Sequence, residues 1–204
     1  MSRKLDPEGY NTMSLDAFKK ALLKNVGPNC KSKATHYSVT LETASTINQE
    51  DFDACFDLIA YTSKLDYELS TTRWNPKAKK KEMKLANMRY LLVRDQIDPG
   101  VLGFASFMLT YEAGKEVVYL YEIHLADKLR NLGIGKQLIN MVSQIGQNAG
   151  VEKIMLTVFV RNSHATEWYT RLGFTLDEFW PEARTLRSGP VKQTDYRILS
   201  RPVS

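Results

Sequence analysis

The residue pattern most able to do chemistry lies between positions 119 and 137, where the sequence reads YLYEIHLADKLRNLGIGKQ. An apolar and aromatic run ends at Leu125, and a turn containing Arg130, Gly133 and Gly135 opens a helix-like segment. Glycines at such a turn let backbone N–H groups approach a ligand closely, and a helix N-terminus attracts phosphate. The stretch therefore predicts a phosphate-binding turn between a strand and a helix.

Two familiar phosphate loops do not fit this turn. A Walker A loop requires glycine where Arg130 stands and Ser or Thr where Gln137 stands. A dinucleotide-binding fingerprint requires a third glycine at Leu138. The remaining motif, Arg130-x-x-Gly133-x-Gly135, is by itself equally compatible with a turn that needs glycine for its geometry alone.

Glu122 interrupts the apolar and aromatic strand and is the candidate general base. Burial beside Tyr121 and Ile123 is expected to raise the pKa of its carboxyl toward neutrality. A free α-amine has an ordinary pKa of ~7.7–8.0, so an amine of this kind needs only a modest base. His124, two residues on and nominally on the same strand face, is the rival base. An edge-strand acid that simply faces solvent is the alternative without catalysis.

Composition places the chain among ordinary globular proteins of about one domain. It has 204 residues, of which 43% are hydrophobic and 25% charged, with a formal net charge of +5. That charge suits a phosphate-bearing partner without requiring nucleic acid. Cys30 and Cys55 are far apart, which excludes a disulfide scaffold and a cysteine zinc site and favours a reducing compartment. Neither a signal-peptide run nor an apolar stretch of membrane-spanning length is visible.

Hydrophobic periodicity predicts helices around a mixed sheet. Helices are expected over 15–24, 50–69, 135–148 and 163–171, with another starting at Asn75-Pro76. Strands are expected over 36–41, 89–94, 101–112, 116–125, 153–160 and 195–200, a loop over 25–33 and a turn over 98–100. The order is helices, an antiparallel meander, then strand–helix–strand–helix–strand. It predicts a single α/β (α+β) domain with a mixed, mostly antiparallel sheet.

The segment after Pro76 carries a run of lysines, namely Lys77, Lys79, Lys80, Lys81 and Lys84. The simplest interpretation is a solvated helix face. A nuclear-import signal and a contact with nucleosomal DNA are the alternatives.

The glycine turn resembles the pyrophosphate loop of the GNAT superfamily of acetyl-CoA-dependent N-acetyltransferases, whose signature is Arg/Gln-x-x-Gly-x-Gly/Ala. The segment NSHATEWYTRLGF (162–174) resembles that family's Asn-x-x-Ala…Tyr…Gly-Phe ending. The stretches LDYELSTTRWNPKAKKKEM, YLYEIHL, KIMLTVF and DYRILSR are similar to the histone-specific N-terminal acetyltransferase D (NatD) group. The resemblance implies an acetyltransferase domain over 50–201, with residues 1–49 forming an N-terminal helix and loop extension packed on it.

The resemblance implies roles for several residues toward acetyl-CoA, with no metal and no covalent intermediate. Glu122 falls on the family's catalytic glutamate. Backbone groups of His124, Leu125 and Ala126 would hold the acetyl-pantetheine end. The pyrophosphate would lie on Leu132, Gly133, Ile134, Gly135, Lys136 and Gln137, with charge from Arg130 and Lys136. Thr157 and Asn162 would contact the pantetheine arm. Tyr169 would protonate or orient the departing thiolate, or else serve only in core packing.

The resemblance also implies a substrate: the N-terminal α-amine of histones of the H-four and H-two-A types, which begin Ser-Gly-Arg-Gly. The substrate pocket would use Tyr67, Thr110, Tyr111, Glu112, Tyr121 and Tyr196, although ten tyrosines cannot all be functional. Relatives carry an aromatic residue where Thr72 stands and an acid where Thr110 stands, which weakens the expected grip on the substrate arginine. Trp74 would partly compensate, and Glu112 could pair with that arginine.

Three functions remain open at this point. The first is histone N-α-acetylation in the nucleus and cytoplasm, without a membrane, an auxiliary subunit or nucleic acid. The second is an acetyltransferase for lysine side chains or small amines on the same fold. The third is a non-catalytic chromatin-binding module that uses the lysine run. Glu122 together with the glycine turn argues against the third.

Overall fold

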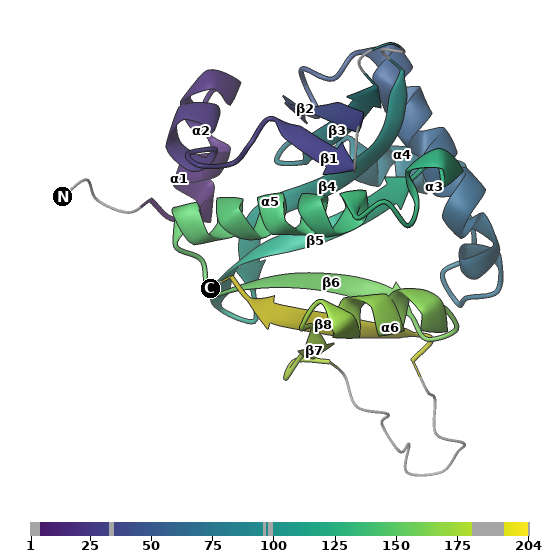
Figure 1. The fold of residues 1–204 in the computed structure, drawn as a ribbon. Coiled ribbons are helices and arrows are strands. Elements are labelled where there is room, and N and C mark those ends of the chain that lie inside the picture. Colours follow the sequence, from purple (N-terminus) through teal and green to yellow (C-terminus); the bar gives the residue numbers. More distant parts are fainter. Residues whose placement is uncertain (1–4, 33–34, 96, 98–99, 181–193, 204) are drawn as a thin grey trace.

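The computed structural model describes residues 5–32, 35–95, 97, 100–180 and 194–203 (Figure 1). Its helices are α1 (Pro7–Asn11), α2 (Leu15–Leu22), α3 (Gln49–Glu68), α4 (Pro76–Met83), the 3-10 turn η1 (Asp127–Leu129), α5 (Ile134–Ala149) and α6 (Ser163–Arg171). Its strands are β1 (Asn29–Ser32), β2 (Thr35–Thr43), β3 (Arg89–Asp95), β4 (Val101–Glu112), β5 (Lys115–Leu125), β6 (Lys153–Phe159), β7 (Thr175–Leu176) and β8 (Tyr196–Pro202).

The strands form one sheet in the order β1-β2-β3-β4-β5-β6-β8-β7. Neighbouring strands are antiparallel except β5 and β6, which are parallel and joined through α5. This arrangement confirms the predicted mixed, mostly antiparallel sheet. The parallel pair follows from the strand–helix–strand order, because parallel neighbours need a crossover connection.

Helices cover both faces of the sheet, which explains why the run of apolar residues in β3 is continuous. Leu91 and Val93 face the core that contains α5, whereas Tyr90 and Leu92 face the core that contains α3 and α4. Alternate side chains of a strand point to opposite faces, so a strand covered on both sides is apolar throughout. The two cores together fix the sheet between its helices.

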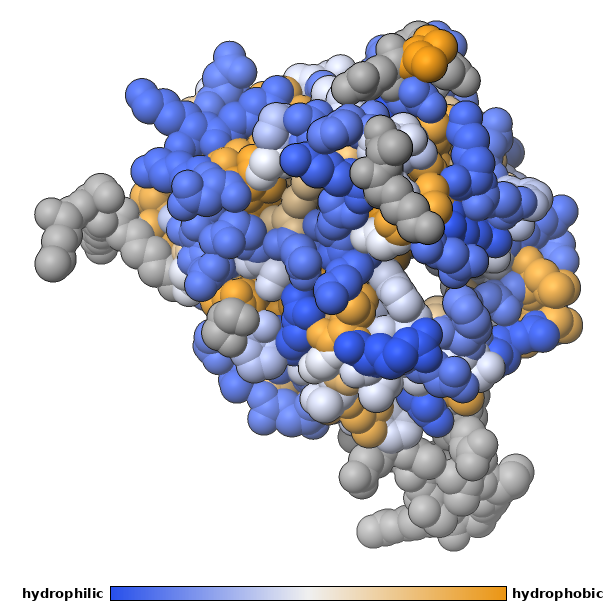
Figure 2. All heavy atoms as spheres, in the orientation of Figure 1, coloured by the Kyte–Doolittle hydropathy of each residue, from blue (hydrophilic) through white to orange (hydrophobic). Residues whose placement is uncertain are grey.

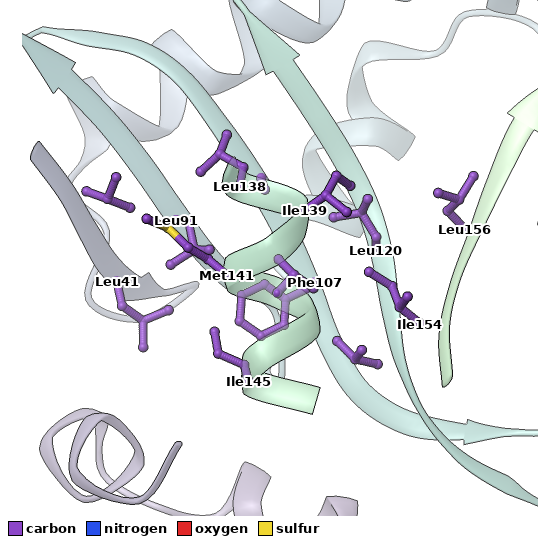
Figure 3. Close-up of a cluster of buried hydrophobic side chains, with 14 of the residues drawn as sticks. Leu41, Leu91, Phe107, Leu120, Leu138, Ile139, Met141, Ile145, Ile154 and Leu156 are labelled. Carbon is purple, nitrogen blue, oxygen red and sulfur yellow. The ribbon is translucent and has the colours of Figure 1, made fainter. Parts of the chain in front are cut away.

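Helix α5 packs along the sheet over β4, β5 and β6 (Figure 3). Its stripe of Leu138, Ile139 and Ile145 is fully buried, as the helical spacing predicts. The helix is flanked by its N-cap Gly133 and its C-cap Gly150, both with left-handed backbone (φ 78 and φ 71) that glycine adopts without strain. The glycine turn therefore lies at the N-terminus of a firmly packed helix.

A β-bulge in β5 decides which of its side chains face α3 and α4. Ser106 pairs with Glu122 and Phe107 with Leu120, so Tyr121 is an extra residue in β5. In an unbroken strand Leu120 and Glu122 would share a face. The extra residue reverses the alternation, so Glu122 lies on the side of α3 and α4 while Leu120 remains in the core below α5.

The N-terminal part differs from the sequence prediction. Residues 25–33 were expected to form a loop, but Asn29–Ser32 forms β1 and pairs with β2, which pairs with β3. Burial of Cys30 anchors this short strand, and the Gln137 side chain bonds both backbone groups of Lys31. The N-terminal residues thus contribute strands to the sheet as well as the predicted helix, which begins at its Ser14 cap. The predicted turn at 98–100 includes Asp98 and Pro99, which lie outside the described residues.

Candidate active site

A cavity of about 630 Å³ opens where β5 and β6 part. The two strands are paired from Val117↔Lys153 to Leu120↔Leu156, yet β5 continues to Leu125 and β6 to Phe159. The cavity lies at and beyond the end of this paired part, and it is lined by residues 119–124 of β5, residues 156–159 of β6 and residues of α3, α4, α6, β4 and β8. The space-filling view is hollowed beside these strand ends (Figure 2).

Glu122 lies at the centre of a chain of polar contacts in this cavity. Its Oε1 accepts a hydrogen bond from Lys79 Nζ at 2.8 Å, and its Oε2 lies 2.6 Å from His124 Nε2. Lys79 Nζ also bonds Glu82 Oε1 at 2.7 Å, and its ammonium lies 4.8 Å from the centre of the Tyr67 ring. The Glu122 and His124 side chains are only 10% and 9% exposed, so solvent screens these charges weakly.

The expected rise in the pKa of Glu122 is wrong. Burial does raise it, but the hydrogen bond from His124 and the charge of Lys79 outweigh burial and lower the pKa from 4.5 to about 2. Glu122 is therefore ionised at neutral pH. A carboxylate with so low a pKa is a weak base on its own. Any proton transfer in this site therefore involves the hydrogen-bonded pair of Glu122 and His124.

His124 is held on both ring nitrogens. Its Nδ1 lies 2.6 Å from Thr62 Oγ1 of α3, and its Nε2 faces Glu122. Both rival bases of the sequence analysis thus belong to one hydrogen-bonded pair on one strand face. The Phe104 ring packs against the imidazole at 5.6 Å and closes the site on the sheet side.

Lys79 corrects the interpretation of the lysine run as a solvated face. Its side chain is only 7% exposed, whereas Lys77, Lys81 and Lys84 are exposed on the same short helix. The reason is helical spacing: Lys79 lies four residues before Met83, the buried apolar anchor of α4, and so shares its face. Two carboxylates compensate the buried charge, which raises the pKa of Lys79 against the effect of burial.

Five of the predicted substrate and cofactor positions in α3, β4, β5 and β8 line the cavity, namely Tyr67, Glu112, Tyr121, His124 and Tyr196. Burial raises the pKa of Tyr67 and of Tyr121 to about 12, so both phenols stay neutral hydrogen-bonding groups. Trp74 does not line the cavity. It lies behind Tyr67, with ring centres 5.5 Å apart, and stacks on Phe56.

The predicted place of Tyr111 in the substrate pocket is wrong. Alternation along β4 puts Tyr111 on the face opposite Glu112, where it is 43% exposed and interacts with Asp6 beside α1. Thr110 is half-buried and does not line the cavity either. Glu112 alone of this hairpin segment reaches it.

The predicted pantetheine contacts lie on the far wall of the cavity. Thr157 Oγ1 is bonded to the Tyr119 hydroxyl at 2.6 Å. Asn162 caps α6 by accepting from Ala165 N, and it donates to Asp66 Oδ2 at 3.1 Å. Tyr169 is buried on α6, which raises its pKa and keeps its phenol protonated. All three predicted residues therefore border the cavity, and their contacts with a ligand stay predictions.

The glycine turn lies outside the cavity lining, next in the chain to the end of β5. Arg130 is half-exposed and bonds Leu125 O and Asp127 Oδ1, while Leu132 and Lys136 are exposed. Leu125 and Ala126 lead into this turn, and Ile134 is fully buried, so only its backbone could meet a phosphate. The Gln137 side chain is engaged by β1.

Gly135 has a packing role that the motif did not indicate. A Cβ at this position would lie 3.1 Å from the Trp168 ring of α6 and 3.6 Å from a methyl of Leu125. The glycine therefore allows α5 to approach α6 closely, and a valine there would disturb the core as well as any bound phosphate.

Sequence reasoning missed Thr62, Ser63, Asp66, Lys79 and Glu82 as cavity or network residues. For Lys79 a signal existed, because the helical position of Met83 marks the buried face of α4. For Thr62 none existed, since a threonine inside a helix pattern is unremarkable until the bulge in β5 brings His124 opposite it.

Carboxylates outnumber cations in the cavity lining. Four carboxylates line it, namely Asp66, Glu82, Glu112 and Glu122, against one lysine, Lys79. The local field is therefore suited to a positively charged ligand although the whole chain carries +5. Among the described residues, no grouping of three potential metal-ligating side chains occurs. In the same part of the chain, no helix combines the length and apolar character of a membrane span.

Two curated proteins are similar to parts of the chain. N-alpha-acetyltransferase 40 of Saccharomyces cerevisiae is 37% identical over 112 residues, which are 46% of this chain and 38% of that protein. Thialysine N-epsilon-acetyltransferase of Bos taurus is 29% identical over 76 residues, or 37% of this chain and 45% of that protein. The chain thus spans less than half the length of these two relatives.

Solved structures show the same fold at low sequence identity. Arabidopsis thaliana Naa50, in complex with the bisubstrate analogue CoA-Ac-MVNAL, has a TM-score of 0.52 and 19% identity, covering 80% of this chain and 97% of that one. The PaiA N-acetyltransferase of Thermoplasma acidophilum, in complex with coenzyme A, has a TM-score of 0.57 and 15% identity, covering 81% and 99%.

A family model decides the classification. The model described as the acetyltransferase (GNAT) family matches residues 48–174, which is more than half of the chain. The match includes the bulged strand, the glycine turn and α6. The chain belongs to the GNAT acetyltransferase family.

Proposed function

We propose that this protein transfers the acetyl group of acetyl-CoA to the N-terminal α-amine of proteins. The observation that carries the proposal is the Glu122–His124 pair, buried where β5 and β6 part in a cavity rich in carboxylates. Membership of the family supports acetyl transfer. The names of the yeast relative and of the Arabidopsis structure support an N-terminal amine.

Glu122 is proposed as the group that accepts the proton of the attacking amine, directly or through water. The amine nitrogen forms a bond to the thioester carbonyl carbon, loses its proton, and the carbon–sulfur bond then breaks. Tyr169, kept protonated by burial, is proposed to donate its proton to the departing thiolate. Holding the amine and the thioester together in the cavity supplies the remaining advantage of an intramolecular reaction.

Acetyl-CoA is proposed to lie between the parted strands with its pyrophosphate at the glycine turn. The described residues fit this molecule, because the β5–β6 ladder ends at Leu120 and leads directly toward the N-terminus of α5. A helix N-terminus with left-handed Gly133 before it offers backbone N–H groups to phosphate. Arg130 and Lys136 would add positive charge at the same turn.

The proposed substrates are histone tails that begin Ser-Gly-Arg-Gly, encountered in the nucleus and cytoplasm. Tyr67, Tyr121 and Tyr196 form aromatic walls suited to a small serine next to the amine. Glu112 and Glu82, on β4 and α4, give the cavity acids that could meet the substrate arginine. Lysine side chains fit less well, because their amines have a pKa of ~10.4 and hold their protons more strongly.

The test is acetylation of matched peptides with labelled acetyl-CoA. Both peptides have the same sequence, which begins Ser-Gly-Arg-Gly and contains an internal lysine. One has a free N-terminus, and its control has a blocked N-terminus. We expect label only on the free α-amine, located by mass spectrometry. Equal rates on the blocked control, with acetyl on lysine, would replace the N-terminal assignment by transfer to side chains.

Transfer to a side-chain amine is the second candidate, favoured by the partial similarity to a thialysine N-epsilon-acetyltransferase. The free amino acids lysine and thialysine are therefore included as substrates in the same assay. A higher rate on these than on the free peptide would favour this second candidate.

A further inference from the structure

The side of His124 that faces away from Glu122 holds a hydroxyl with two close, competing partners and a third, more distant one, Ser63 Oγ at 3.5 Å. Thr62 Oγ1 lies 2.6 Å from His124 Nδ1 and 2.9 Å from Leu58 O, one helical turn earlier in α3. A threonine hydroxyl carries a single hydrogen, so it can donate to only one of these partners at a time.

Each choice fixes a different number of protons on the Glu122–His124 pair. When Thr62 donates to Leu58 O, its oxygen must accept from His124 Nδ1–H. The 2.6 Å contact between Nε2 and Oε2 then needs a second proton, because two acceptors would otherwise face each other. When Thr62 donates to Nδ1, the single imidazole proton lies on Nε2 and points to Glu122. The first arrangement therefore carries one proton more than the second. We call the first arrangement loaded and the second free.

We propose that the Thr62 hydroxyl is a positioning group that sets whether the Glu122–His124 pair is free to accept the amine proton. Only the arrangement in which Thr62 donates to Nδ1 leaves the pair able to take that proton. The loaded arrangement already carries it. This inference deepens the proposed acetylation of amines, and its catalytic consequence rests on that proposed function. The coupling between the Thr62 hydroxyl and the protonation of the pair exists without substrate.

The other groups around the pair do not duplicate this role. On the Glu122 side, the ammonium of Lys79 of α4 favours the ionised form of Glu122, and Glu82 pairs with the same ammonium. The ionisable groups that face the pair from α3, β3 and α6 are phenols with raised pKa values, which stay neutral at physiological pH: Tyr67, Tyr90 and Tyr169. The Phe104 ring of β4 covers the imidazole without a hydrogen bond to offer. Thr62 is thus the neighbour whose orientation can follow the protonation of His124.

The sign of the effect follows from the strengths of the two hydrogen bonds. An imidazolium N–H donating to Thr62 makes a charge-assisted bond, roughly twice as strong as the neutral bond from Thr62 to Nδ1. Replacing the hydroxyl by a methyl group therefore disfavours the loaded arrangement more than the free one. The pair should take up its proton at a pH about one unit lower in Thr62→Val than in the natural protein.

The experiment compares three variants of the full chain. Thr62→Val removes the hydroxyl and keeps the branched shape, and Thr62→Ser restores the hydroxyl. Thr170→Val is the matched control, because Thr170 Oγ1 makes the same bond to the carbonyl four residues earlier, Thr166 O at 2.9 Å, on the exposed face of α6. Melting curves establish that each variant is folded.

The first readout needs no substrate. Imidazole ¹⁵N chemical shifts of His124, followed from pH 5 to 8, report when the pair takes up its proton. We expect a shift of about one pH unit to lower pH in Thr62→Val, and natural behaviour in Thr62→Ser and Thr170→Val. Proton uptake at the same pH in Thr62→Val and in the natural protein would overturn the proposal, whatever substrate the protein uses.

The second readout is the pH dependence of acetylation at saturating peptide. Deprotonation of the substrate amine affects the pH–rate profile of every variant equally. A difference between the profiles of two variants therefore reports the protonation of the Glu122–His124 pair. The acid limb should move to lower pH in Thr62→Val alone. An unchanged profile, despite a changed ¹⁵N titration, would overturn the catalytic part of the proposal. Absence of acetylation in the natural protein would overturn the proposed function, and the ¹⁵N comparison would still decide the coupling.

Discussion

In the cavity around Glu122, the charged side chains already have partners within the protein, whereas the turn from Arg130 to Gly135, outside the cavity lining, presents exposed side chains and the N-terminus of a helix. Glu122, Lys79 and His124 are each at most 10% exposed, while the Arg130 side chain is 46% exposed. Buried charges interact strongly and resist reorganisation, but exposed charges are screened by solvent and salt. The cavity is therefore suited to hold the proposed reacting groups in fixed positions, and the turn is suited to bind an anion from solution.

This difference predicts what substitutions in the cavity and at the turn will do. Changes in the buried network should alter turnover, pH dependence and stability together. Changes at the exposed turn should alter ligand affinity, and that effect should fade at high salt. The three predictions that follow test this contrast.

The largest effect is expected from Glu122→Gln. Turnover should fall by about 10²–10⁴, because the amide cannot accept the amine proton. Affinity for acetyl-CoA should remain nearly natural, since the glutamate faces Lys79 and His124 rather than the glycine turn. Steady-state rates at saturating peptide from pH 6 to 9, with calorimetry of acetyl-CoA binding, measure both quantities.

The control for this variant is Glu167→Gln, an exposed glutamate on α6 that lies 3.9 Å from Arg171. It removes the same charge from the surface and should leave turnover unchanged. Near-natural turnover of Glu122→Gln across the whole pH range would remove Glu122 from the mechanism.

The second prediction contrasts two neighbouring lysines of α4. Lys79→Met should lower the free energy of unfolding by about 3–5 kcal/mol, because it leaves a buried carboxylate without its cation. Lys80→Met removes the pair between Lys80 and Asp53, whose side chains are 41% and 43% exposed, together with the contact of the Lys80 ammonium with the Phe56 ring, and should cost at most about 2 kcal/mol. Urea unfolding at neutral pH measures the difference.

The same pair of variants has a pH signature. The pKa of Glu122 lies below its ordinary value, so Glu122 stabilises the fold above about pH 4.5 and loses that contribution as pH falls toward 2. Without Lys79, burial is opposed less, the pKa of Glu122 rises, and this acid-dependent part of stability shrinks. Equal losses of stability in Lys79→Met and Lys80→Met would contradict the buried network.

Most of the fold could be predicted from the sequence because its elements have strong periods and clear ends. Helix α5 has a fully buried apolar stripe between two glycines, and the β4–β5 hairpin turns at Ala113 and Gly114, both with positive φ. Strand β1 could not be predicted, because NCKS has one apolar residue and is held by the Gln137 side chain from far along the chain. Long-range support of this kind leaves no local pattern.

The candidate site was predictable in only some of its residues, and less so in its electrostatics. Glu122 and His124 stood out as polar residues in an apolar strand, and both line the cavity. The direction of the pKa shift of Glu122 could not be read from its own strand, since it depends on Lys79 arriving from α4. The bulge at Tyr121 likewise leaves no signature in the sequence, yet it turns Glu122 toward α4.

The smallest effect is expected from Arg130→Ala at the exposed turn. Arg130 lies at the first position of the motif, and its side chain bonds Leu125 O and pairs with Asp127, so it both supplies charge and braces the turn. Affinity for acetyl-CoA should weaken roughly fivefold at low salt, the size of a single partly exposed charge interaction of about 1 kcal/mol. Turnover at saturating acetyl-CoA should change little, because the substitution does not touch the buried network.

Salt dependence separates the charge of Arg130 from its bracing role. Raising ionic strength to about 1 M shortens the Debye length to ~3 Å, so the affinities of the natural protein and of Arg130→Ala should converge if charge dominates. Lys20→Ala, on the surface of α2, is the control for removal of an equal charge elsewhere. A loss of turnover in Arg130→Ala as large as that in Glu122→Gln would mean that the cavity and the turn are not independent, because the turn would then be setting the geometry of the proposed reacting groups.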